Sequence, residues 1–190
     1  MKKVFFITFF IFFSFKVFSL EVTLTQGSVK PTPIAVTELY SKNSQLTKVG
    51  KNISTVISDN LERSGLFLPI DKRSFIQDNQ SLSNKPRFED WKLIKAQHLV
   101  SGKISSNNGK ISVEFRLYDV FQQKQIVGKK YETNDKNWRR VAHIISDSIF
   151  KNITGEGGYF DTRIVYVAET GPKENKQKRL AIMDQDQSNH

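Results

Sequence analysis

Residues 111–118 read Ile-Ser-Val-Glu-Phe-Arg-Leu-Tyr, an alternation in which apolar side chains stand at every second position. Successive side chains of a β-strand point to opposite faces, so this stretch predicts a strand with one buried and one wet face. The dipeptide Asn108-Gly109 just before it is typical of a two-residue hairpin turn. Residues 98–105 and 125–132 have strand composition on either side. The sequence therefore predicts a meander of three antiparallel strands.

Two long amphipathic helices flank this meander. The first is predicted over residues 44–64 and ends before Gly65, and the second begins after Asn134 or Asp135 and ends at Gly155. Each has one apolar stripe, made of Leu46, Val49, Ile53, Val56, Ile57 and Leu61 in the first and of Trp138, Val141, Ala142, Ile145, Ile149 and Ile153 in the second. The predicted fold class is α+β, a small mixed or antiparallel sheet with the two long helices packed on one face.

The remaining segments of this domain have weaker signals. Residues 34–36 predict a short buried strand, and residues 66–70 predict an extended core segment. Residues 71–84 have no period and are predicted as a surface loop. Residues 86–96 predict a short helix that buries Trp91 and Ile94.

The N-terminus has the features of a secretory signal peptide. Lys2 and Lys3 precede a mainly apolar run over residues 4–15, and small side chains at Val17 and Ser19 predict cleavage between Ser19 and Leu20. The run is shorter than the roughly 20 residues that cross a bilayer, although an uncleaved membrane anchor stays an alternative. The chain has no Cys, so neither a lipid anchor nor a disulfide is predicted. We expect residues 1–19 to direct export to the periplasm.

The segment behind the cleavage site alternates like a strand. It consists of Glu21, Val22, Thr23, Leu24, Thr25, Gln26 and Gly27. An exposed strand of this kind can pair with the edge of a sheet, its own or a partner's. We therefore predict that these residues form a partner-binding site.

The C-terminal part differs from the domain that precedes it. Three glycines within residues 155–158 follow the second helix, and we predict a linker over residues 155–161. Residues 162–168 and 179–183 predict two strands joined by a Lys-rich loop. A lone two-stranded hairpin is marginally stable in water, so residues 162–190 are expected to belong to a larger β structure.

The sequence offers no catalytic constellation. His98, His143 and His190 have no partner at metal-ligand spacing, and Asp184 and Asp186 lack the Gly and Glu of a calcium loop, so a turn is favoured there. There is no Cys nucleophile and no Ser in a nucleophile elbow. The prediction is a protein without catalytic residues, cofactor, metal or small-molecule substrate. An enzyme that acts on envelope polymers stays an alternative without residues to support it.

The positive charge is not arranged as a nucleic-acid site. The formal net charge of +10 drops by three, to +7, when Lys2, Lys3 and Lys16 leave with the signal peptide. The remaining basic residues are scattered along the chain. We interpret them as a solvated surface beside anionic envelope polymers and predict no nucleic-acid partner.

Several segments, taken in order, resemble the TolB family of the Tol-Pal cell-envelope system. Residues 57–67 read Ile-Ser-Asp-Asn-Leu-Glu-Arg-Ser-Gly-Leu-Phe, similar to the family's acidic-x-Leu-x-x-Ser-Gly-x-Phe, and Asp90-Trp91 leads into Val-Ser-Gly-Lys-Ile at residues 100–104. The other matching segments are residues 21–24, 33–36, 113–119, 138–150, 154–155, 158–160 and 162–167. The resemblance covers about 170 residues and implies a non-enzymatic adaptor of the envelope-integrity and cell-division system.

The resemblance also implies a domain plan and two protein partners. Residues 20–154 correspond to the family's N-terminal α+β domain, and residues 162–190 to the start of the first blade of its β-propeller. In the family, residues like 21–27 contact the C-terminal domain of TolA, and the propeller docks the peptidoglycan-associated lipoprotein Pal. Gln187 stands where the family has Gly, and two blade strands are present, so we expect a truncated copy or a split gene that has lost Pal binding. The alternatives are an envelope regulator or assembly protein with a related α+β domain, and a non-functional gene fragment.

Overall fold

A computed structural model describes residues 30–107 and 109–190 of this protein. The predicted signal peptide, its cleavage site at Ser19 and Leu20, and the predicted partner-binding residues 21–27 lie outside the described residues. Within the described part, no helix combines the length and the apolar character needed to cross a membrane.

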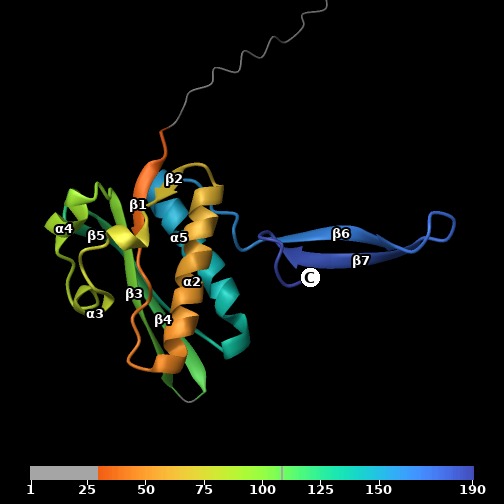
Figure 1. Ribbon diagram of the computed structural model, residues 1–190, viewed down its shortest axis with the longest axis horizontal. Helices are drawn as coiled ribbons and strands as arrows, with labels where there is room; N and C mark the ends of the chain where they lie inside the picture. The colour runs from red at the N-terminus through yellow and green to blue at the C-terminus, as the bar shows by residue number, and fades with distance from the viewer. Residues whose placement is uncertain (1–29, 108) are drawn as a thin grey trace, which may run out of the picture.

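The core of the protein is a five-stranded mixed sheet (Figure 1). Its strands are β1 (Thr32–Val36), β2 (Phe67–Pro69), β3 (His98–Asn107), β4 (Lys110–Asp119) and β5 (Lys124–Thr133). They lie in the order β2-β1-β3-β4-β5; β1 is parallel to both of its neighbours, and β3, β4 and β5 form an antiparallel meander. The predicted meander is confirmed, with strand ends within two residues of the prediction.

The two long helices, α2 (Ser44–Arg63) and α5 (Trp138–Thr154), cover one face of the sheet (Figure 1). The side chain of Asn43 caps α2 by accepting a hydrogen bond from the Gln45 N–H, and Gly155 ends α5 in the left-handed conformation. Their stripes pack on the inward side chains of the strands in one core, which includes Ile53, Ile57, Leu61, Ile104, Val113, Phe115, Leu117, Ala142, Ile145 and Ile149. The predicted fold class is confirmed.

The opposite face of the sheet carries a second, smaller core, which the sequence did not predict. Ala35, Leu99 and Tyr118 point to this side and pack with Leu82 and Trp91. The prediction that this face is wet is therefore wrong at the end of the sheet near Leu99 and Tyr118. It holds further along β3 and β4, where the outward residues Ser105, Ser112 and Glu114 keep part of their surface exposed.

The segment of residues 71–93, which supplies Leu82 and Trp91 to this second core, contains three short helices. They are the 3-10 helix η1 (Lys72–Ser74), α3 (Asn79–Leu82) and α4 (Phe88–Leu93), so the predicted surface loop over residues 71–84 is wrong in part. Buried Gln77 organises the segment, because its Oε1 accepts hydrogen bonds from Arg87 N at 2.8 Å and from Trp91 Nε1 at 3.1 Å. Hydrogen bonds between residues this far apart produce no periodic pattern in the sequence, so the sequence did not predict them.

Strands β6 (Arg163–Thr170) and β7 (Gln177–Asp184) form an antiparallel hairpin that projects from the α+β body (Figure 1). The two predicted strands are confirmed, each longer than expected. Large apolar side chains stay exposed on it, including Val165 at 66% and Leu180 at 81%. The 3-10 helix η2 (Asp135–Asn137), capped by Asn134, leads from β5 into α5. The domain boundaries at residues 154 and 161 stay predictions.

Candidate functional site

The predicted partner-binding segment leads directly into β1. Lys30, the first described residue, is exposed, and Pro31 has no N–H with which to extend a ladder. The first backbone hydrogen bond of the sheet here runs from Thr32 N to Leu66 O at 2.9 Å. Because β1 has β2 on one side and β3 on the other, both of its edges are already paired. The described residues thus begin with an exposed residue, Lys30, shortly before the interior strand β1.

A buried polar cluster, here called the junction, joins the hairpin to the two long helices. It consists of Asn60 on α2, Arg139 and His143 on α5, and Gln185 and Asp186 in the turn after β7. Arg139 donates to Asp186 Oδ2 from Nε at 2.9 Å and from Nη2 at 2.7 Å, and Gln185 Nε2 donates to Asn60 Oδ1 at 3.1 Å. The junction therefore anchors the base of the hairpin to both helices.

The hydrogen bonds of Asn60 determine which ring nitrogen of His143 carries the proton in the neutral ring. Arg63 can only donate, and its Nη2 lies 2.5 Å from Asn60 Oδ1, so the amide nitrogen of Asn60 faces His143 Nδ1 at 2.9 Å. Nδ1 therefore accepts, and in the neutral ring the proton sits on Nε2. Among the described residues Nε2 has no hydrogen-bond partner, but it points at the carboxylate of Asp186, whose Oδ2 is 3.6 Å away.

Burial and charge act in opposite directions on the junction groups. Burial lowers the pKa of His143 below its ordinary value, although Asp186, Asp184 and Asp161 work to raise it. Burial raises the pKa of Asp186, but the hydrogen bonds from Arg139 and from Ser188 N–H together bring it below its ordinary value. At neutral pH the junction holds an uncharged imidazole beside an ionised Arg139–Asp186 pair.

The junction also brings together possible cation ligands that the sequence keeps far apart. Ligand atoms of His143, Asp184 and Asp186 lie within 4.8 Å of one another, a grouping that the spacing of these residues in the sequence does not indicate. The hydrogen bonds nevertheless oppose a metal ion. A metal on Nε2 would require the proton on Nδ1, where the Asn60 amide already donates, and Arg139 occupies Asp186.

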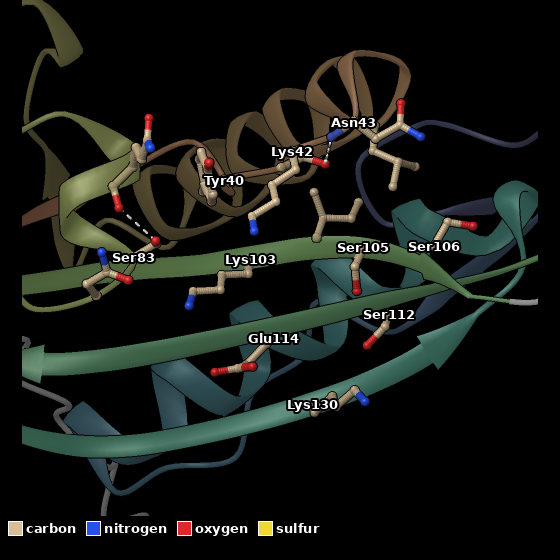
Figure 2. Close-up of a pocket in the computed structure, with 15 residues that line it drawn as sticks. Tyr40, Lys42, Asn43, Ser83, Lys103, Ser105, Ser106, Ser112, Glu114 and Lys130 are labelled. Carbon is tan, nitrogen blue, oxygen red and sulfur yellow. Dashed lines mark hydrogen bonds between the residues drawn. The ribbon is translucent and has the colours of Figure 1, made fainter.

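A polar groove of about 730 Å³ lies on the other face of the sheet, beside the second core (Figure 2). One wall is the segment of residues 40–43, which is held to β3 by hydrogen bonds from Tyr40 N to Gly102 O and from Ile104 N to Tyr40 O. The floor comes from outward residues of β3, β4 and β5. The lining includes Lys42, Asn43, Gln80, Ser83, Asn84, Lys103, Ser105, Ser106, Ser112, Glu114 and Lys130.

The described residues that line the groove supply cations and hydroxyl groups but no imidazole. Figure 2 shows the side chain of Lys42 extending toward β3, while Lys103 lies over the sheet with its amine on the β4 side of β3. Such a lining can bind an anionic group, but it lacks a base that titrates near neutral pH. The sequence did not predict this site, because its residues come from five separate segments. The available signal was the row of polar residues at every second position of β3 and β4.

The architecture and the comparison with protein families define the class of this protein. The architecture defines a small α+β domain followed by a β hairpin. Residues 20–126, more than half of the chain, match the family model of the TolB amino-terminal domain, so the chain belongs to the TolB family.

Known relatives extend the match beyond this domain. The Tol-Pal system protein TolB of Paramagnetospirillum magneticum is 49% identical over 172 residues, which cover 90% of this chain and 38% of that relative. The chain thus spans well under half of the relative's length.

Solved structures agree on the fold. The crystal structure of TolB from Acinetobacter baumannii superposes with a TM-score of 0.71 at 24% identity, covering 84% of this chain and 37% of that one. The C-terminal domain of LpoB from Salmonella enterica reaches a TM-score of 0.39 at 17% identity, over 58% of this chain and 87% of that one. A likeness this weak carries no argument about function.

Proposed function

We propose that this chain is a non-enzymatic adaptor of the Tol-Pal system, exported to the periplasm, whose mature N-terminal segment binds the C-terminal domain of TolA. The relative that covers 90% of the chain is itself named as a Tol-Pal system protein. The observation that carries the proposal is the alternating segment of residues 21–27, which stands between the predicted cleavage site and β1.

The surroundings of β1 support a binding role for this segment. Pro31 separates it from the ladder that begins at Thr32, and the neighbours of β1 already occupy both of its edges. An alternating segment of this kind could add a strand to the sheet of a partner. Main-chain hydrogen bonds would supply affinity, and the alternate side chains Val22 and Leu24 would fill pockets on the partner.

The chemistry of the two described polar sites supports a non-enzymatic role. His143 is 2% exposed and its ring is held by Asn60, so it offers no proton-transfer group to a substrate. The groove has hydroxyl groups without a neighbouring imidazole to activate them.

Binding to Pal is not part of the activity proposed for these residues. In the TolB family the Pal surface belongs to the propeller, and the described residues contribute the strands β6 and β7 to such a structure. We expect the 190-residue chain to bind Pal far more weakly than it binds TolA.

A peptide titration tests the proposal. A peptide of residues 20–32 is titrated against the C-terminal domain of TolA from the same organism, and saturable binding is expected. The matched control peptide carries Val22→Ser and Leu24→Ser, which keep its charge and length and should abolish binding. If the native peptide shows no saturable binding at high micromolar concentration, the proposal is contradicted.

A further inference from the structure

We infer that the groove beside residues 40–43 is a second docking surface, which takes an extended acidic segment of a protein partner. The inference is independent of the proposed contact with TolA, because the groove and the N-terminal segment involve different residues. It rests on charges, unpaired polar groups and strand geometry that meet in one place (Figure 2).

The groove carries positive charge that its own residues do not compensate. Lys42, Lys103 and Lys130 come from three separate elements and line one groove. Among the described residues, neither Lys42 nor Lys103 forms an ion pair, and Lys130 Nζ is 3.7 Å from Glu132 Oε1 in a contact whose side chains are about 60% exposed. Solvated lysines usually spread apart, so gathering three ammonium groups around one space favours an anionic occupant.

The carboxylate and the helix end that lie at the groove do not balance this charge. Glu114, the one acidic residue of the lining, forms its ion pair with Arg116 rather than with Lys103, although Lys103 is its direct cross-strand neighbour. Helix α2 begins at the groove with Asn43 as its cap, and its first turn contains no acidic residue. The positive end of the helix dipole therefore adds to the lysines.

The strands that form the floor of the groove favour an extended ligand. The floor repeats at strand spacing, because Lys103 pairs with Glu114, and Ser105 pairs with Ser112 two residues further along. Ser105, Ser106 and Ser112 make no side-chain hydrogen bond within the described structure, so their hydroxyl groups are available to a ligand. An extended peptide presents its side chains at the same two-residue repeat, and its carboxylates can reach the lysines while its backbone meets the hydroxyl groups.

The experiment uses the mature chain, residues 20–190, and a fluorescent peptide of alternating Glu and Ser, with a Gln-Ser peptide as the neutral probe. Anisotropy at low salt should show saturable binding of the acidic peptide, weakened by added salt, and none of the neutral one. The variant K42Q/K103Q should lose about tenfold or more in affinity. The matched control K48Q/K129Q removes the same charge outside the groove and should change affinity less than about twofold. Glu114→Gln should tighten binding.

Three results would overturn the inference. One is no binding of the acidic peptide up to millimolar concentration, and another is an equal loss in both double variants, which would reduce the effect to net charge. The third is tighter, groove-dependent binding of a single-stranded RNA oligonucleotide, which would make this a nucleic-acid site. Removal of residues 20–27 should leave peptide binding unchanged, and K42Q/K103Q should leave TolA binding unchanged, so the two proposals can fail separately.

Discussion

Asn60 holds the polar interior of this protein in one arrangement. Its Nδ2 donates hydrogen bonds to His143 Nδ1 at 2.9 Å and to Ser146 Oγ at 3.0 Å. Its Oδ1 accepts hydrogen bonds from Arg63 and from Gln185 of the turn after β7. It is fully buried within the apolar stripe of α2. A polar residue on that stripe was visible in the sequence, but its partners were not, because Gln185 is 125 positions away.

His143 should make the protein less stable in acid. Burial lowers its folded pKa below the ordinary 6.5, so the unfolded chain takes up the proton first as pH falls. The stabilising contribution is therefore complete above pH 6.5 and is lost as pH falls from there toward the lowered folded pKa. Urea unfolding at pH values on both sides of 6.5 measures this. His143→Gln should flatten the dependence, leaving a remainder from His98, whose pKa burial also lowers. An unchanged slope in the variant would contradict the assignment.

Gly102 should not tolerate a side chain. A Cβ there would lie 2.1 Å from Glu114 O and 2.8 Å from Leu39 Cδ2, so strands β3 and β4 would have to move apart. We expect Gly102→Ala to cost about 2–3 kcal/mol of unfolding free energy. The matched control is Gly128→Ala on β5, where the nearest atom belongs to the flexible side chain of Gln125. Urea denaturation compares the two, and equal losses would show that the close approach is not the cause.

At the scale of elements, helices and strands could be predicted from the sequence where their hydrophobic pattern was long. The alternation in β4 and the stripes of α2 and α5 were long enough to identify each element and its buried face. A four-residue helix such as α3 cannot display a stripe, so it was predicted as a loop. Residues 34–36 and 66–70 were predicted as extended, but the parallel pairing of β1 with β2 depends on how α2 packs between them, which no local pattern states.

The attachment of the hairpin should depend on the Arg139–Asp186 pair. Asp186 has 5% of its side chain exposed and Arg139 has 28%, so Asp186→Asn removes a largely buried charge contact. We expect it to loosen the turn after β7 by about 1–2 kcal/mol, which hydrogen exchange of that turn and of the α5 residues facing it would detect.

The control for this prediction is the more exposed pair between Arg140 and Asp161. Its Nε–Oδ1 distance is 3.2 Å and the Arg140 side chain is 65% exposed. Arg140→Gln should therefore change exchange by less than about 1 kcal/mol. Equal effects of the two variants would mean that the junction does not hold the hairpin.

At the scale of the whole molecule, the sequence indicated class and family but not the two polar sites. Both the junction and the groove join residues from segments far apart in the chain, and only packing places them together. The predicted partner-binding residues 21–27 lie outside the described residues, so their role rests on the sequence, the family and the exposed lead into β1.

The most direct test of the adaptor role compares two forms of the whole protein. The mature chain, residues 20–190, and a chain that starts at residue 28 are each titrated against the C-terminal domain of TolA by calorimetry. Both should unfold at the same temperature, because β1 and its hydrogen bonds begin at Thr32. The mature chain should bind saturably, and the shortened chain should not bind. Equal binding by both forms, or none by the mature chain, would contradict it.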